Sequence, residues 1–245
     1  MQQIVLPKII AHRGASANAP ENTHSALRLA AEYGARWVEI DVMLAACHTP
    51  IIFHDDTLER CSNGTGRLID QPYTVLRQLD AGAWFAPQFA GEQIATLTNT
   101  VELLIQLNMG LNLEIKPLQG LEQVTAQAVV TALQQIDIHR LPLLISSFSP
   151  RCLAIARDQL PNIPRGFLTE KIPPHWQSLL QELRCISLHC DYTTLTASQV
   201  QAVKTAGYQV LTFTVNQPQQ ARQLFAWGVD AVFSDYPQLL INELL

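Results

Sequence analysis

Short apolar runs alternate with amphipathic segments along most of the chain. Eight of the apolar runs are typical of buried strands, and they lie at residues 8–12, 37–42, 111–115, 143–148, 165–169, 185–190, 210–215 and 231–235. Helical periodicity fills most of the intervals, at residues 23–34, 121–136, 149–160, 198–207 and 217–228. Gly34, Gly207 and Gly228 stand where helix C-caps are expected.

This alternation of strand and helix predicts a parallel sheet. Eight such units within 245 residues predict a closed (β/α)₈ TIM barrel, with residues 1–245 as a single domain. A doubly wound open sheet is the alternative, but no GxGxxG motif follows the first predicted strand.

The region after the second strand departs from this rhythm. Residues 41–54 are predicted to form a hairpin that turns at Cys47-His48, pairing 46 with 49 and finally 41 with 54. This register would place His54 beside Asp41. Residues 57–95 are rich in Gly, Asn, Thr and aromatic residues and do not form a βα unit, so we expect an inserted cap over one end of the barrel.

Composition excludes several functional classes. With 48% hydrophobic and 15% charged residues, the chain can bury a large core. A net charge of −5 gives no basic field for nucleic acid or an anionic membrane, and no apolar run approaches the ~20 residues of a membrane span. The N-terminal residues lack the features of a secretory signal, and the five cysteines lack CxxC spacing. We therefore expect free thiols, a cytoplasmic location and no stable membrane association, whereas the oligomeric state is left open.

Acidic residues collect at the predicted ends of two strands, which share one face of a barrel. Glu39 and Asp41 are two residues apart and point the same way, and Glu114 and Lys116 repeat this spacing. Three converging carboxylates would repel each other unless a cation lay between them. Oxygen ligands favour one hard divalent ion, Mg²⁺ or Ca²⁺, over zinc. The alternatives are a solvated strand face for Glu39 and Asp41 and a surface ion pair for Glu114 and Lys116.

Two histidines and two basic residues accompany these carboxylates. His12 and His54 flank the predicted metal, and a histidine pair can divide acid and base roles near neutral pH. Arg13 and Lys116 add fixed positive charge that suits a phosphate oxygen. The combination indicates phosphoester cleavage. The remaining histidines that we interpret as surface or core residues are His24, His139, His175 and His189.

Several motifs, in their order along the chain, carry a resemblance to a known family: AHRGASANAPENT, VEIDVML, PIIFHDDTLERCSNGTG, LDAGAWF, GEQIATL, LNLEIKP, LLISSF, TFTVN and GVDAVFSDYP. The chain resembles the glycerophosphodiester phosphodiesterases, especially the short cytoplasmic bacterial type linked to glycerol-3-phosphate uptake. This resemblance runs nearly from end to end. It implies a TIM barrel with a small insertion after the hairpin of the second strand.

The resemblance also implies roles for individual residues. One divalent cation would be bound by Glu39, Asp41 and Glu114, with His12 and His54 as the acid–base pair; the phosphate would be held by Arg13 and Lys116. The implied substrates are small diesters such as glycerophosphocholine and glycerophosphoethanolamine, and the products are sn-glycerol 3-phosphate and an alcohol.

Two positions depart from the family pattern. The family usually turns its hairpin on Lys-Asp-Gly, where this chain has Ala46-Cys47-His48, so the turn type is open. The family often carries Trp or Tyr in the penultimate strand, where this chain has Phe213.

Two other functions compete with this interpretation. A phospholipase C or D relative would act on intact lipids and needs an exposed rim that faces the membrane. The acidic net charge disfavours such a rim, whereas the aromatic pair Trp84-Phe85 in the predicted cap is compatible with one. A catalytically silent binding protein on the same barrel predicts a lost histidine or carboxylate, and none of the seven site residues is altered.

Overall fold

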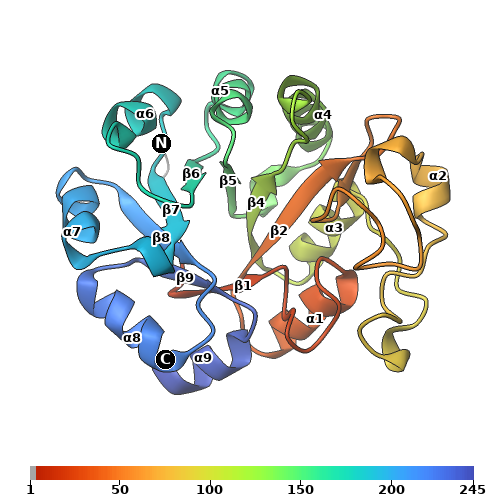
Figure 1. Cartoon of the computed structure of the whole chain (residues 1–245), viewed down its shortest axis with the longest axis horizontal. Helices are drawn as coiled ribbons and strands as arrows, with labels where there is room; N and C mark the ends of the chain where they lie inside the picture. Colours follow the sequence, from red (N-terminus) through yellow and green to blue (C-terminus); the bar gives the residue numbers. More distant parts are fainter. Residues whose placement is uncertain (1–3) are drawn as a thin grey trace.

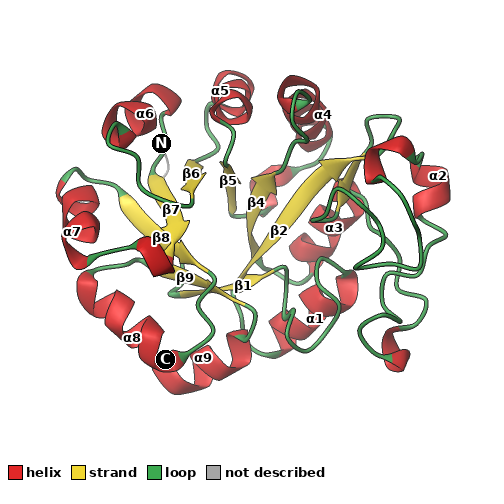
Figure 2. Ribbon diagram, viewed as in Figure 1, coloured by secondary structure: helices red, strands yellow, loops and turns green. Residues whose placement is uncertain are grey.

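Parallel strands form a closed barrel with helices packed around it (Figures 1 and 2). The structure is a computed structural model that describes residues 4–245. The order around the barrel is β1-β9-β8-β7-β6-β5-β4-β2, and pairing of β1 with β2 closes it. The predicted TIM barrel is therefore confirmed, with β3 as an additional strand at its edge.

The eight barrel strands fall where the apolar runs predicted them. Their bounds are β1 (Ile9–His12), β2 (Trp37–Leu44), β4 (Gly110–Ile115), β5 (Leu143–Ser147), β6 (Arg165–Thr169), β7 (Ser187–Asp191), β8 (Gln209–Phe213) and β9 (Ala231–Ser234). The additional strand is β3 (Pro50–Ile52). Nearly every residue of these strands is buried, so their sequences are continuous apolar runs and do not alternate between apolar and polar residues.

The helices of the barrel cover the outside of the strands (Figure 1). Five were predicted, namely α1 (His24–Glu32), α4 (Glu122–Gln134), α5 (Pro150–Gln159), α7 (Ala197–Thr205) and α8 (Pro218–Trp227). The sequence interpretation missed α3 (Leu97–Gln106), α6 (Trp176–Leu183), α9 (Pro237–Leu244) and the short α2 (Tyr73–Leu76). Two of the missed helices, α3 and α6, are followed by left-handed residues other than glycine, Asn108 and Arg184, so the usual stop signal is absent.

The segment between β3 and α3 lies beside the barrel, at the right of Figure 1, and includes α2. It shares a small hydrophobic core with the hairpin of β2 and β3, formed by Met43, Ala45, Ile51, Phe53, Leu58, Cys61, Leu68, Leu76, Ala81 and Ile94. The insertion is thus attached through its own apolar contacts. Its role as a cap stays a prediction.

The hairpin has the predicted antiparallel direction, but the predicted register is wrong by one residue. Val42 pairs with Ile52 and Leu44 with Pro50, so that Asp41 lies opposite Phe53 rather than His54. The Ala45 N–H donates to the Thr49 carbonyl at 3.0 Å. A three-residue loop, residues 46–48, therefore connects the strands instead of the predicted two-residue turn.

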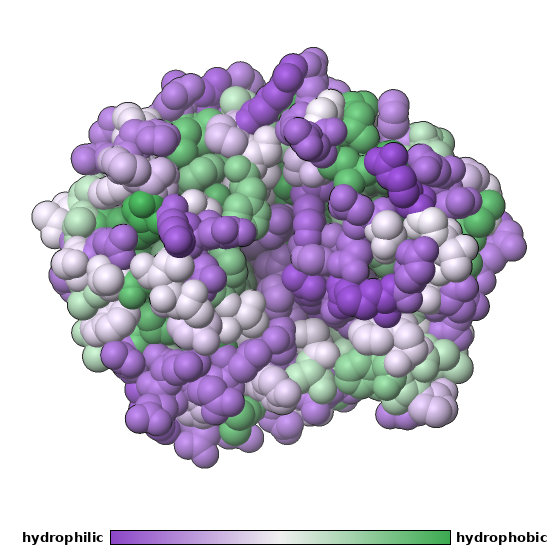
Figure 3. Space-filling model, in the orientation of Figure 1, coloured by the Kyte–Doolittle hydropathy of each residue, from purple (hydrophilic) through white to green (hydrophobic). Residues whose placement is uncertain are grey.

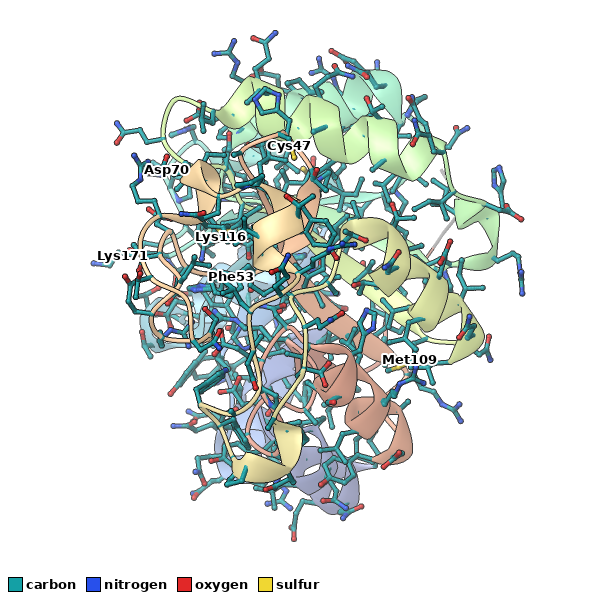
Figure 4. All side chains as sticks on the ribbon, turned by 90° about the vertical axis from the view of Figure 1, so that its right-hand side faces the viewer. Cys47, Phe53, Asp70, Met109, Lys116 and Lys171 are labelled. Atoms are coloured by element: carbon teal, nitrogen blue, oxygen red, sulfur yellow. The ribbon has the colours of Figure 1, made fainter. Side chains whose placement is uncertain are left out.

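The backbone conformation of His48 explains the longer loop. Its φ is 57°, in the left-handed region. Three-residue hairpin loops commonly end on such a residue, which is usually glycine. Figure 4 shows Cys47 at the tip of this hairpin, away from Lys116 at the mouth of the barrel. Because β3 ends at Ile52, no ladder hydrogen bond positions His54.

We expect His48→Gly to raise the free energy of unfolding by about 0.5–1 kcal/mol, because glycine adopts positive φ without steric cost. The control is Ala46→Gly in the same loop, where φ is not positive and added chain entropy should lower stability by a similar amount. Urea denaturation monitored by circular dichroism measures both. Equal destabilisation by the two substitutions would contradict the loop conformation described above.

Candidate active site

The carboxyl ends of the barrel strands open into a cavity of about 660 Å³. All seven residues singled out from the sequence line it: His12, Arg13, Glu39, Asp41, His54, Glu114 and Lys116. The opposite wall is apolar and includes Phe148, Leu168, Phe213 and Phe233. Figure 3 shows the hollow at the centre of this face, with hydrophilic residues mainly on one side and hydrophobic residues on the other.

Glu39, Asp41 and Glu114 form an acidic cluster at the ends of β2 and β4. Parallel pairing sets Asp41 beside Glu114, and Glu39 lies one layer deeper on the same strand face as Asp41. Each residue offers a carboxylate oxygen, and these oxygens lie within 4.8 Å of one another. Glu39 and Asp41 are only 4% and 2% exposed. Side chains 73 residues apart in the chain, at 41 and 114, thus meet through strand register.

Burial and mutual repulsion strongly affect the protonation of this cluster. Burial, followed by the charges of Asp41 and Glu114, raises the pKa of Glu39 well above its ordinary value. Burial and the charge of Asp41 raise the pKa of Glu114 to about 8. Burial also opposes ionisation of Asp41, but the positive charges of Arg13, His54 and Lys116 outweigh it, so the pKa of Asp41 is lowered.

These residues fit a hard divalent cation. Glu39 Oε1 is buried and has no hydrogen-bond partner among residues 4–245, so an acceptor is available within the cluster. Carboxylate oxygens alone are the donor set of Mg²⁺ or Ca²⁺ rather than of a softer metal. A cation would also relieve the repulsion that raises the pKa values of Glu39 and Glu114.

Arg13 reaches the acidic cluster from a tight turn after β1. Arg13 and Gly14 both have positive φ, 56° and 83°. A Cβ on residue 14 would lie 2.7 Å from the backbone carbonyl carbon of Ala26, so only glycine fits there. The Arg13 N–H donates to Glu39 Oε2 at 3.1 Å, and its Nε lies 3.2 Å from Asp41 Oδ2.

Lys116 completes the positive side of the cavity. It follows β4 directly, and its charge helps to lower the pKa of Asp41. In the side view of Figure 4, Lys116 and Met109, which flank β4, lie toward opposite ends of the barrel. Lys116 is therefore at the end of the barrel that carries the acidic cluster.

His12 is held by a carboxylate at the far end of the chain. Its Nδ1 lies 2.7 Å from Asp235 Oδ1, and its Nε2 lies 3.9 Å from Glu39 Oε2. Asn216 Nδ2 and Ser16 Oγ also donate to Asp235, at 2.8 and 3.0 Å. Burial opposes ionisation of Asp235, but these hydrogen bonds and His12 outweigh it and lower its pKa to about 2. Asp235 therefore remains an anion that binds Nδ1 and leaves Nε2 of His12 toward the acidic cluster.

His54 is held by the residue that follows it. Its Nδ1 lies 2.5 Å from Asp55 Oδ1. Arg60 donates to both oxygens of Asp55, at 2.6 and 2.8 Å. Burial lowers the pKa of His54 despite the charge of Asp41, which acts in the opposite direction.

The sequence interpretation overlooked the carboxylates that support the site. Asp235 is the last residue of the predicted strand at 231–235, and its contact with His12 spans 223 residues. Asp55 and Arg60 stand within the motif PIIFHDDTLERC, so their proximity to His54 was the available signal. Glu21 lies in AHRGASANAPENT and binds Arg13 Nη1 at 2.8 Å. Of the other histidines, His189 is fully buried in the barrel and bonds to Ser187.

The geometry combines three chemical capacities around one cavity. The acidic cluster can hold a cation, Arg13 and Lys116 can bind anionic oxygens, and two imidazoles can transfer protons. These are the groups that phosphodiester cleavage needs.

Comparisons with known proteins agree with this chemistry. The model of the glycerophosphoryl diester phosphodiesterase family matches residues 12–239. A glycerophosphodiester phosphodiesterase of Caldanaerobacter subterraneus subsp. tengcongensis is 32% identical over 235 residues, which cover 96% of each protein. One from Bacillus subtilis is 29% identical over 252 residues, covering 94% of this chain and 84% of the relative.

A solved structure is also similar over almost the whole chain. It is an Oleispira antarctica phosphodiesterase in complex with the product sn-glycerol-3-phosphate, with 46% sequence identity and a TM-score of 0.95. The alignment covers 98% of this chain and 97% of that one.

We predict that the metal-free protein loses stability as the pH rises from about 4.5, the ordinary glutamate pKa, toward the pKa of about 8 of folded Glu114. The folded state holds this proton more tightly than the unfolded chain over that range, so deprotonation favours unfolding. Mg²⁺ or Ca²⁺ binds the deprotonated carboxylates, so either ion should raise the melting temperature more at pH 8 than at pH 6.

Thermal unfolding with and without the ion measures this effect. Glu114→Gln should flatten the pH dependence and remove most of the stabilisation by the metal. The control Glu102→Gln changes an exposed residue of α3 and should behave like the unmodified protein. Undiminished metal stabilisation of the Glu114→Gln protein would show that this carboxylate is not a ligand.

Proposed function

The chain belongs to the glycerophosphoryl diester phosphodiesterase family, and we propose that it hydrolyses small glycerophosphodiesters to sn-glycerol 3-phosphate and a free alcohol. Glycerophosphocholine and glycerophosphoethanolamine are the expected substrates. The observation that carries this proposal is the convergence of two histidines, three carboxylates and two basic residues on one cavity. The product complex of the similar Oleispira antarctica phosphodiesterase supports the same product here.

In the proposed site, Arg13 and Lys116 bind the phosphate of the diester. Both face the cavity beside the acidic cluster, where fixed positive charge stabilises an anion and the charge that develops during displacement. Glu39, Asp41 and Glu114 would hold one Mg²⁺ or Ca²⁺ ion, which supplies Lewis-acid polarisation of a phosphoryl oxygen when bound. The choice between these two ions is left to experiment.

The two histidines act as the acid–base pair. One imidazole takes a proton from the attacking water molecule as its oxygen forms a bond to phosphorus, and the other donates a proton to the alcohol oxygen as its bond to phosphorus breaks. If a glycerol hydroxyl of the substrate attacks first instead, the alcohol leaves in the same way and water then opens the resulting cyclic phosphate. Asp235 and Asp55 each bind an Nδ1 atom, so Nε2 of both His12 and His54 is available for proton transfer.

The size and nature of the cavity favour small substrates over intact lipids. A cavity of about 660 Å³ is in the range of small-molecule sites. No helix among the described residues is long and apolar enough to cross a membrane. Trp84 and Phe148 are 40% and 45% exposed, and they are the feature that favours the alternative, a phospholipase-like enzyme.

We also propose a cytoplasmic location. All five cysteines are free in the part of the chain that the structure describes, and four of them are buried. Unpaired cysteines in this number are typical of a reducing compartment.

His12→Ala and His54→Ala should each lower kcat by roughly 10²–10⁴-fold, because each removes one proton-transfer group. Metal binding should persist in both variants, since the acidic cluster is unchanged. ³¹P NMR of a mixed panel of glycerophosphodiesters with Mg²⁺ or Ca²⁺ measures turnover and identifies the products. His175→Ala, at an exposed position, is the control. More than about a tenth of the unmodified rate in either variant would rule out its assigned role, since that loss is smaller than acid–base removal causes.

Hydrolysis of phosphatidylcholine vesicles should be far slower than hydrolysis of glycerophosphocholine. A cavity of about 660 Å³ suits a small diester rather than an intact diacyl lipid. The two substrates are compared at equal concentration by release of choline-containing products. Comparable rates would favour the phospholipase alternative.

A further inference from the structure

Arg60 connects two carboxylates that each support a different residue of the site. It lies near the start of the insertion, in the segment that follows His54. Its Nε and Nη2 donate to Asp55 at 2.6 and 2.8 Å. Its Nη1 and Nη2 donate to Glu21 at 2.6 and 2.9 Å. One guanidinium thus makes two bidentate contacts, a geometry that a lysine ammonium cannot reproduce.

Each of the two carboxylates also binds a residue that lines the cavity. Asp55 Oδ1 lies 2.5 Å from His54 Nδ1, and Glu21 Oε1 accepts a hydrogen bond from Arg13 Nη1 at 2.8 Å. Asp55 Oδ1 and Glu21 Oε1 also contact the same nitrogen of Arg60, Nη2. A continuous chain of charged groups therefore runs from His54 through Arg60 to Arg13.

Neither end of this chain is held by regular secondary structure. His54 lies beyond the last paired residue of β3. Arg13 lies in a left-handed turn just after β1. Contacts with Asp55 and Glu21 therefore help to set the distance across the cavity between the imidazole of His54 and the guanidinium of Arg13.

Without Arg60, the same carboxylates would work against the site. Asp55 and Glu21 would face each other as two anions with no cation between them, and their repulsion would move His54 and Arg13 apart. A displacement of about 1 Å at a catalytic group can cost roughly 10²-fold in rate.

We propose that Arg60 is a positioning residue that holds His54 and Arg13 together across the site through Asp55 and Glu21. The inference rests on the proposed function, in which His54 transfers a proton and Arg13 binds the phosphate. It also gives the insertion a catalytic purpose, because the insertion supplies a residue that aligns the barrel's own site.

The Arg60 side chain is 45% exposed, so substitutions there should leave the barrel folded. Arg60→Gln should lower kcat by about 10- to 100-fold through His54. It should also raise the inhibition constant for sn-glycerol 3-phosphate by about tenfold or more through Arg13, since the loss of a well-placed charge-assisted contact is of this size. Arg60→Lys should recover only part of either loss.

Two further variants distinguish the contact of Arg60 with Asp55 from its contact with Glu21. Asp55→Asn should affect mainly kcat, and Glu21→Gln should affect mainly the inhibition constant. Adding Arg60→Gln to Asp55→Asn should lower kcat by less than threefold, because residues that act through one contact are not additive. Added guanidinium ion should restore activity to Arg60→Ala, which a general loss of structure would not allow.

Arg67→Gln is the matched control, because Arg67 lies in the same insertion and its side chain makes no ion pair within residues 4–245. Arg60→Gln with unchanged kcat and inhibition constant, or a full additive loss in the double variant, would overturn the inference. Lack of diesterase activity in both the unmodified protein and Arg67→Gln would instead refute the proposed function.

Discussion

The repulsion among three clustered carboxylates, two of them buried, is the interaction on which the rest of the site depends. Parallel register brings Asp41 and Glu114 to one level, with Glu39 just below them. In a barrel lined by apolar residues, such a cluster is unfavourable unless positive charge compensates it. The pKa values of Glu39 and Glu114 are raised because their ionised forms are unfavourable in this cluster. The pKa of Asp41 is lowered because nearby positive charges stabilise its ionised form.

Charges of alternating sign surround the acidic cluster. Arg13, Lys116 and His54 form an inner positive layer that lowers the pKa of Asp41. An outer negative layer of Glu21, Asp55 and Asp235 then binds Arg13, His54 and His12. This arrangement stabilises the protein and also prepares the site, because the groups that balance the carboxylates are those that can bind a phosphate and move protons.

The hairpin and insertion contribute to the site indirectly. A loop ending at left-handed His48 shifts the register by one residue, so strand pairing ends before His54. Side-chain contacts of Asp55 and Arg60 take over the task of orienting the imidazole. The small core between hairpin and insertion keeps Arg60 close to the barrel, because it anchors residues on both sides, such as Leu58 and Cys61.

The sequence alone predicted the barrel and seven of the residues that line its cavity. Apolar runs and glycine-ended helices are local signals, and the spacing of Glu39 and Asp41 gives a common direction on any strand. Helices α3 and α6 were not predicted, because each is followed by a left-handed residue other than glycine. These residues are Asn108 and Arg184, and glycine is the usual sequence signal for this position. The hairpin register was not predictable for the same reason, since His48 carries no signal of positive φ. The partnerships of His12 with Asp235 and of Arg60 with Glu21 were decided only by the tertiary structure, because closing the barrel and docking the insertion join residues 223 and 39 positions apart.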